Sequence, residues 1–399
     1  MALILRDACI IDGRGDVQAR GFITIDNDRI VGVGKGSGPA KKNGHEGIDL
    51  EGRCVLPGMI DCHVHLCIDG SADPMQSIQK DSAAMITLKA ARHAHLSLLA
   101  GVTTVRDLGS HNGISVSLRE AINLGVVTGP RIVSTNQAVC ITGGQGWQFS
   151  RQADGEDGVR QAVREQIRAG ADAIKMMATG GVITQGVEPG SPQFTLEELK
   201  AGAEEAHKAG RKIAAHAQGN AGIKDALRAG FDTIEHGIFL DEEAIGLFLE
   251  KKATLVPTLS APFNIMEKGE KSGIPLFIIE KTRKVKDAHM ESIKKAHKAG
   301  ITIASGADSG TPFNIHGENP KELELLVGIG LSPMEAIVSA THVAAETLGL
   351  GSGLGTIEPG KLADLIVVEG DPLNDIAVLQ RKDKIVVVMK DGRFYKRSI

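Results

Sequence analysis

The feature that most constrains the fold is a repeated pattern in the middle of the chain. An amphipathic helical stretch is followed by Ala-Gly and then by a short β-branched run, as in LLAG-VTTVRD, HKAG-RKIAAHA and LRAG-FDTIEHG. Glycine after the last helical turn is a common helix C-cap, and such runs suit strands that are buried on both faces of a parallel sheet. The pattern therefore predicts helices that alternate with parallel strands.

Eight strands of this kind are expected between residues 55 and 308. They are the runs VLPGMIDCHVH, VTTVRD, RIVST, ADAIKMM, RKIAAHA, FDTIEHG, TLVPTL and ITIASGAD. Eight parallel strands close a (β/α)8 TIM barrel, which usually needs ~250 residues, and the chain has 399. The predicted fold class is therefore α/β, with a barrel that spans residues 57–350.

The two ends of the chain show a different pattern of short alternating strands and turns. GFITIDNDRIVGVG lies near the start, and LADLIVVEGDP and KIVVVMKDGRFYK lie near the end. Alternation of this kind is typical of strands with one buried face. We expect residues 1–56 and 351–399 to pair and to form a small β-sandwich module beside the barrel. Two independent β extensions are the alternative.

Composition argues against several classes of function. The formal net charge is −4, and Trp147 and Tyr395 are the only residues of their types, so a nucleic-acid partner is not indicated. The five cysteines form no CxxC pair, which favours a reducing compartment. The start of the chain does not resemble a secretory leader, and no uncharged apolar run reaches ~18 residues. We expect a soluble cytoplasmic protein with no membrane partner.

Two histidines at the end of the first predicted barrel strand, His63 and His65, are candidate metal ligands. Residues i and i+2 of a strand point to the same side, so both imidazoles are expected to face the barrel mouth. A second pair with the same spacing, His93 and His95, lies in a helical segment and is interpreted as a chance cluster. Position in the predicted fold thus separates the two pairs.

A lysine inside an apolar strand, Lys175 of ADAIKMM, is the second unusual feature. Burial of an ammonium group is costly unless the group is neutralised or paired. One interpretation is a side chain that reaches the barrel rim. The other is an amine that has reacted with carbon dioxide, so that the two oxygens of a carbamate bridge two divalent ions.

Three further metal-competent residues end predicted strands, namely His216, His236 and Asp308. Single histidines at strand ends are often only core residues. Together with the first histidine pair and the lysine, however, they place six such groups at the carboxyl ends of five strands. In a (β/α)8 barrel this is the face where active sites are built.

The chain resembles the amidohydrolase superfamily over nearly its whole length. The motifs that carry the resemblance are VLPGMIDCHVHL, VTTVRDLG, GADSGTP and GTIEPGKLADLIVV, with the lysine and histidines above. The branch that it resembles contains Xaa-Pro dipeptidases, N-acyl amino acid hydrolases and imidazolonepropionase-related amidohydrolases, including enzymes that act on the amide of ochratoxin. Relatives are commonly oligomeric, so the resemblance implies a homo-oligomer.

The resemblance also implies a binuclear metal centre. By that likeness the more buried ion is held by His63, His65 and Asp308. The second ion is held by His216 and His236, and the lysine carbamate bridges the two. Zinc is the favoured metal because nitrogen and oxygen ligands suit it, although manganese, cobalt or iron fit the same geometry.

The implied reaction is hydrolysis of an amide C–N bond of a small substrate, such as a dipeptide or an N-acyl amino acid, by a metal-activated hydroxide. Asp308 is the predicted catalytic residue, since it is placed to pass a proton from the hydroxide to the leaving nitrogen. Related mononuclear deaminases usually carry a glutamate where this chain has Gly219, which argues against deamination. Hydrolysis of a cyclic amide (lactam or imidazolone) or a lactone is the alternative. A non-catalytic binding protein is a third interpretation. It is disfavoured because all six expected metal-ligand positions carry a residue that can bind a metal.

Four residues are candidate substrate contacts, namely Arg106, Gln145, Gln218 and His316. Gln145 lies in the loop AVCITGGQGWQF, where the resembled branch commonly has a histidine that helps to position a substrate carboxylate. Glutamine keeps a hydrogen-bond donor but carries no positive charge. The change favours an uncharged or cyclic amide as the substrate.

Overall fold

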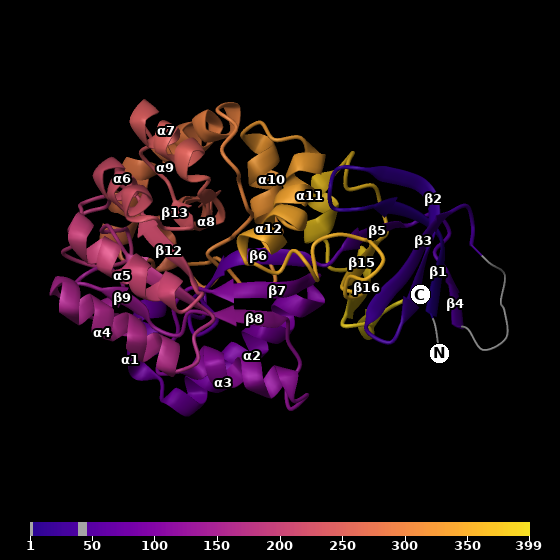
Figure 1. The fold of residues 1–399 in the computed structure, drawn as a ribbon, viewed down its shortest axis with the longest axis horizontal. Helices are drawn as coiled ribbons and strands as arrows, with labels where there is room; N and C mark the ends of the chain where they lie inside the picture. Colours follow the sequence, from indigo (N-terminus) through magenta and orange to yellow (C-terminus); the bar gives the residue numbers. More distant parts are fainter. Residues whose placement is uncertain (1–2, 39–45) are drawn as a thin grey trace.

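The computed structural model describes residues 3–38 and 46–399. The architecture is mixed α/β, with one sheet built from both ends of the chain and parallel strands in between (Figure 1). The terminal sheet has eight strands in the order β17-β16-β15-β5-β1-β2-β3, with β4 paired to β1. Its strands are β1 (Leu3–Ile11), β2 (Val17–Asp26), β3 (Arg29–Lys35), β4 (Glu46–Asp49), β5 (Cys54–Pro57), β15 (Leu365–Val368), β16 (Ile385–Lys390) and β17 (Arg393–Arg397).

The N-terminal and C-terminal segments meet in this sheet where β5 pairs with β15. The two strands are antiparallel, with Val55 opposite Val367 and Leu56 opposite Ile366. All four side chains are buried. In Figure 1 the indigo strands of the N-terminal segment accordingly lie beside the yellow strands of the C-terminal segment. The two ends of the chain therefore stabilise one another.

The middle of the chain alternates parallel strands with helices. One sheet has the order β6-β7-β8 and another the order β10-β9-β11-β12-β13-β14. The strands are β6 (Met59–Val64), β7 (Val102–Asp107), β8 (Arg131–Ser134), β9 (Ala138–Cys140), β10 (Ser150–Gln152), β11 (Ala173–Met177), β12 (Lys212–Ala217), β13 (Thr233–His236) and β14 (Thr254–Val256). The helices are α1 (Pro74–Lys80), α2 (Ala83–Leu99), α3 (Ile114–Asn123), α4 (Gly155–Arg168), α5 (Leu196–Lys208), α6 (Asn220–Ala229), α7 (Glu242–Lys251), α8 (Ser260–Lys268), α9 (Leu276–Lys298), α10 (Lys321–Gly328), α11 (Pro333–Ser339) and α12 (His342–Thr347). Within the described part of the chain, none of the helices has both the length and the apolar character needed to cross a membrane.

The repeated Ala-Gly of the sequence lies where helices end. The glycines that follow the last helical turns have φ between 66° and 93°, and they are Gly101, Gly170, Gly210, Gly230 and Gly300. Glycine adopts this left-handed conformation without the steric cost that other residues meet. The predicted role of these glycines as helix caps is therefore confirmed, and each cap turns the chain toward the next parallel segment.

The eighth predicted strand, residues 301–308, is not a regular strand, and that prediction was wrong. Isolated parallel bridges join the segment to β14 through Ile303 and the residue after it, Ser309, to β6. The backbone leaves strand geometry at Asp308, which has a φ of 57°. The amide of Ala307 donates to the side chain of Asp61 instead of to a neighbouring strand. Backbone hydrogen bonds still hold the segment between β14 and β6, because the amide of Ala304 donates to the carbonyl oxygen of Leu255 at 3.0 Å and the amide of Cys62 donates to that of Ser305 at 2.9 Å.

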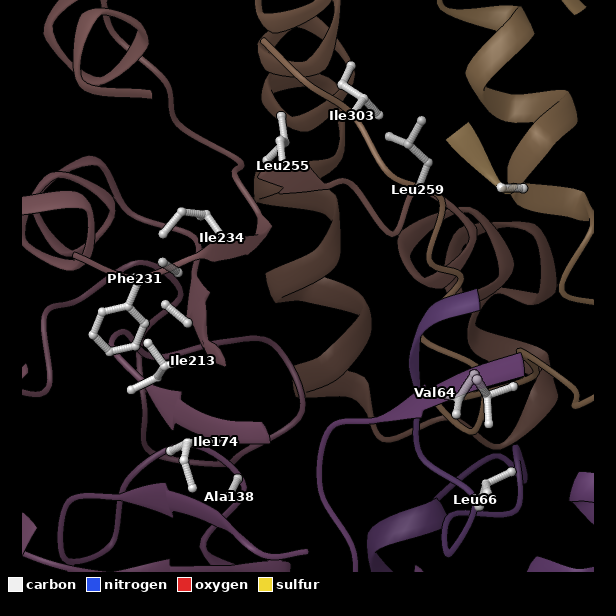
Figure 2. Close-up of a cluster of buried hydrophobic side chains, with 14 of the residues drawn as sticks. Val64, Leu66, Ala138, Ile174, Ile213, Phe231, Ile234, Leu255, Leu259 and Ile303 are labelled. Atoms are coloured by element: carbon white, nitrogen blue, oxygen red, sulfur yellow. The ribbon is translucent and has the colours of Figure 1, made fainter. Parts of the chain in front are cut away.

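The core beside these strands is aliphatic. Ile174, Ile213, Ile234 and Leu255 come from the successive strands β11 to β14, and Ile303 comes from the segment that follows (Figure 2). Ile174 pairs with Ile213 across β11 and β12, and Ile234 pairs with Leu255 across β13 and β14. Burial of each such side chain contributes ~1.5–3 kcal/mol to the stability of the folded protein. This layer therefore fixes the strands whose ends carry polar side chains.

Arg131 of β8 links the parallel strands to the terminal sheet. Its guanidinium donates to Thr104 Oγ1 at 3.0 Å and to Asp364 Oδ2 at 2.8 Å, and it also donates to the carboxylate of Asp391. The side chain of Asp364 is 3% exposed, and its other oxygen accepts from the amide of Asp391 at 2.8 Å. An ion pair with a buried carboxylate therefore joins the two parts of the molecule.

We predict that Arg131→Ala lowers the free energy of unfolding by about 2–4 kcal/mol, because it leaves the buried carboxylate of Asp364 without its cation. Chemical denaturation followed by circular dichroism measures the loss. Arg14→Ala is the control, since Arg14 pairs with Glu358 at the exposed surface and a loss below ~1 kcal/mol is expected. Equal losses in the two variants would be inconsistent with a stabilising role of the buried pair.

Candidate metal centre

Three of the predicted ligands form a compact cluster. His63 lies in β6, His65 follows that strand, and Asp308 lies in the loop beyond Ile303. Asp308 Oδ1 is 3.4 Å from His63 Nε2 and 3.3 Å from His65 Nε2. The ligand atoms of the three buried residues all lie within 4.8 Å of one another. Two imidazoles and a carboxylate at this spacing suit a divalent metal ion.

The backbone around Asp308 holds its side chain at the histidines. The amide of Asp308 donates to the carbonyl oxygen of His63 at 2.7 Å. Its φ of 57° lies in the left-handed region, which is uncommon for residues other than glycine. The side-chain amide of Asn314 donates to the carbonyl oxygens of Ala307 and Asp308 at 2.6 and 3.0 Å. The surrounding structure thus fixes an unfavourable conformation, as is common at functional sites.

A second pair of histidines lies beside this cluster. His216 Nδ1 in β12 and His236 Nε2 in β13 are 2.8 Å apart, and the rings of His63 and His236 are 5.3 Å apart. His236 Nδ1 is 2.7 Å from Thr258 Oγ1, which leaves Nε2 directed at His216. The two facing nitrogen atoms are therefore available as ligands.

Lys175 of β11 is buried at the same place, with 1% of the residue exposed. Its Nζ atom has no hydrogen-bond partner among the described residues, and neither has Asp308 Oδ1. Burial lowers the pKa of Lys175 to about 8, so that part of the amine population is neutral near that pH. Buried polar atoms without partners are unfavourable unless another group, such as a metal ion or a ligand, binds to them.

The buried histidines are suited to bind a metal in their neutral form. Burial lowers the pKa of His63 to about 4 and that of His216 to about 3, and Lys175 adds to both shifts. The pKa of His236 lies well below its ordinary value, chiefly through burial. Neutral imidazole is the form that coordinates a metal ion. The donor set and its unpartnered atoms therefore fit a divalent ion.

Glu235, which the sequence reasoning missed, holds His63 in place. Its Oε2 accepts from His63 Nδ1 at 2.8 Å, and its Oε1 accepts from Arg106 at 2.8 Å and from Thr233 Oγ1 at 2.6 Å. Burial alone would raise the pKa of Glu235, but Arg106, His63 and Lys175 lower it to about 2. The signal was present in the sequence, because Glu235 is a charged residue in a buried strand, as Lys175 is.

Asp61, also missed, ties the backbone of the cluster together. Its carboxylate accepts from the amides of His63 at 2.9 Å and Ala307 at 3.1 Å, and from the side chain of Asn319 at 2.6 Å. Burial raises the pKa of Asp61 to about 6. These bonds join β6 to the loop that carries Asp308, so Asp61 positions ligands from two distant parts of the chain.

A cavity lies against these residues. All six predicted ligands line it, and so do two of the four predicted substrate contacts, Gln145 and Gln218. Much of the remaining wall is aliphatic or aromatic. An apolar cavity with a few convergent polar groups is typical of sites for small molecules.

The other two predicted substrate contacts, Arg106 and His316, are not among the described residues that line this cavity. Arg106 is 1% exposed and donates to the carboxylate of Glu235 at 2.8 Å. His316 Nε2 is 2.9 Å from the carbonyl oxygen of Ile68, and its ring stacks on that of His93 with centroids 4.5 Å apart. Their observed contacts are with the protein, and contact with a substrate stays a prediction.

Known proteins are similar to this chain over nearly its whole length. The model of the amidohydrolase family matches residues 54–395. The ochratoxinase of Aspergillus niger is 32% identical over an alignment of 426 positions, which covers 98% of this chain and 86% of the relative.

Solved structures show the same similarity. A Xaa-Pro dipeptidase with bound methionine has a TM-score of 0.91 and 36% identity, covering 99% of this chain and 100% of that chain. A prolidase complexed with N-methylphosphonate-L-proline has a TM-score of 0.93 and 32% identity, covering 100% of both chains. The resemblance predicted from the motifs is confirmed, and the chain belongs to the amidohydrolase family.

Proposed function

We propose that this protein hydrolyses an amide C–N bond of a small substrate with the help of two divalent metal ions, of which zinc is favoured. The observation that carries the proposal is the convergence of six metal-competent side chains on one cavity. Family membership supports a hydrolase, and the similarity to an ochratoxinase and a prolidase supports an amide bond as the target. Dipeptides and N-acyl amino acids are therefore the first substrates to test.

The proposed ligands divide into two sets. We assign one ion to His63, His65 and Asp308, and the second to His216 and His236. A carbamate, formed when the neutral amine of the buried lysine of β11 adds carbon dioxide and releases a proton, would supply oxygen ligands to both ions. Its formation requires the neutral amine, and the lowered pKa of this lysine supports that requirement. Nitrogen and oxygen donors of this kind suit zinc.

The ions, when bound, supply a nucleophilic water at neutral pH and polarise the scissile carbonyl. Asp308 would accept a proton from the attacking water and pass it to the leaving nitrogen. Burial alone would raise the pKa of Asp308, but His63 and His65 lower it, so the carboxylate is ionised and able to accept a proton at neutral pH. Glu235 keeps His63 Nε2 directed at Asp308 because it holds Nδ1 of the same ring.

We further propose that residues 57–350 close into a (β/α)8 barrel and that residues 1–56 and 351–399 form a β-sandwich module. Hydrogen bonds at both gaps between the parallel sheets support closure. The backbone amide of Asp172 donates to the carbonyl oxygen of Ser134 at 2.7 Å. At the other gap, the amide of Ala304 donates to the carbonyl oxygen of Leu255 at 3.0 Å, and the amide of Cys62 donates to that of Ser305 at 2.9 Å. In the terminal sheet, β3 bridges the segment that leads into β15, which supports a sheet folded on itself.

We predict that protein purified without chelator holds about two divalent ions per chain and that Lys175→Ala loses metal and lowers kcat/KM at least ~100-fold. The panel of substrates contains dipeptides, N-acyl amino acids, lactams and lactones, and elemental analysis gives the metal content. Lys200→Ala is the control, because Lys200 is exposed in α5.

Each outcome of this experiment is informative. One ion per chain with full activity in Lys175→Ala would exclude the bridging carbamate. Ring opening of a lactam or lactone without cleavage of any linear amide would replace the proposed reaction with its alternative.

We predict that Glu235→Gln weakens zinc binding by ~10–100-fold, because the ionised partner that orients a metal-binding histidine is lost. Competition with a fluorescent chelator measures the zinc affinity of the metal-free protein without reference to activity. Glu165→Gln is the matched control. Glu165 lies on α4, where it pairs with Arg151 and does not line the cavity. Zinc affinity that is the same in Glu235→Gln and in the unsubstituted protein would refute the role assigned to Glu235.

A further inference from the structure

We propose that the cavity selects amides that carry apolar groups beside the scissile bond and no carboxylate. The inference rests on the proposed amide hydrolysis, but it points away from dipeptides and N-acyl amino acids, because both carry a carboxylate. Three observations carry it, namely an apolar wall, two buried amide side chains with atoms that have no hydrogen-bond partner among the described residues, and the lack of a free cationic side chain among the described lining residues other than the proposed lysine ligand.

The wall of the cavity around the metal-competent residues is apolar. It includes Ile68, Phe149, Ile238, Ile265 and Val285, each of which is at most 4% exposed. Contact with such a wall is favourable for apolar substrate surface, because that surface leaves water. The wall also disfavours a charged group that has to leave water to enter the cavity.

Gln145 presents a free hydrogen-bond donor at the metal centre. The residue is 3% exposed, and its Oε1 accepts from the amide of Gly181 at 3.1 Å. This bond fixes the side-chain amide, and its Nε2 donates to no described residue. A Cβ atom built on Gly181 would lie 2.8 Å from both Gln145 Nε2 and His216 Nε2, so the donor lies beside a proposed metal ligand.

Gln218 supplies a second side-chain amide that can pair with a substrate. The residue is 4% exposed, and its Oε1 has no hydrogen-bond partner among the described residues. Its backbone is fixed because the amide donates to Thr179 Oγ1 at 3.0 Å and the carbonyl oxygen accepts from Phe239 at 3.0 Å. A buried amide without partners is unfavourable, and a substrate that pairs with it removes this penalty. The two glutamines are thus suited to neutral N–H and C=O groups.

The cavity offers a carboxylate no arginine, and no lysine besides the proposed ligand, among its described lining residues. Lys281 of α9 donates to the backbone oxygens of Thr184, at 2.7 Å, and Val187, so its ammonium group is paired within the protein. His289 borders the cavity, but its Nε2 is 3.0 Å from the carbonyl oxygen of His236. A substrate carboxylate would lack the charge-assisted partner that usually holds such a group.

The test compares two amides that differ by one carboxylate, N-acetylphenethylamine and N-acetyl-L-phenylalanine, with the zinc-loaded protein. Both are also prepared as hexanoyl derivatives, so that the length of the acyl chain is varied separately. Release of the amine is followed with an amine-reactive dye. We expect kcat/KM to be at least ~10-fold higher for the phenethylamine amides than for the phenylalanine amides.

Arginine variants test whether charge in the cavity governs this preference. Gln145→Arg is expected to shift the ratio of the two kcat/KM values toward the carboxylate substrate by at least ~10-fold. Gln218→Arg makes the same test from a second position. It takes the place of Gln145→Arg if circular dichroism shows that the Gln145→Arg variant is unfolded. Gln79→Arg is the matched control, because Gln79 is exposed in α1 and its substitution should leave the ratio unchanged.

The possible results separate this inference from the proposed function. A preference for the phenylalanine amides in the unsubstituted protein would overturn the inference and leave amide hydrolysis standing. A ratio that stays unchanged in both folded arginine variants would also overturn it. Cleavage of neither amide pair, nor of any linear amide in the wider panel, would instead overturn the proposed function.

Discussion

The ion pair between Arg106 and Glu235 is the interaction on which the site depends. The two side chains are 2% and 0% exposed, and their nearest charged atoms are 2.8 Å apart. The pair links β7 to β13, and the other carboxylate oxygen of Glu235 holds His63. Either charge alone would be strongly unfavourable in this interior. The parallel strands carry ionisable groups beside an aliphatic core because these groups compensate one another.

Strand order brings the remaining polar groups to the same place. His216 and His236 lie on adjacent parallel strands, and Lys175 lies on β11, which pairs with β12. Asp308 joins them although its segment is not a strand, because Asp61 binds the backbone of both the β6 strand and this loop. The result is a set of nitrogen and oxygen donors that belongs to no single stretch of sequence.

The parts of this arrangement that leave local signals could be predicted from the sequence. The Ala-Gly repeats mark helix caps, and a lysine in an apolar strand marks a buried amine that needs a partner. The supporting contacts could not be predicted, because they join distant residues. Periodicity indicates that Arg106 is at a strand end, but its partner Glu235 lies 129 positions away along the chain. The irregular backbone at Asp308 likewise depends on side chains that no local pattern identifies.

Diffraction at the zinc absorption edge from crystals of the zinc-loaded protein tests the proposed metal centre most directly, because it locates ions without reference to activity. We predict two anomalous peaks in each chain, as expected for a binuclear hydrolase. One should be bounded by His63, His65 and Asp308, and the other by His216 and His236. A single peak, or ions bound away from these residues, would contradict the proposed metal centre.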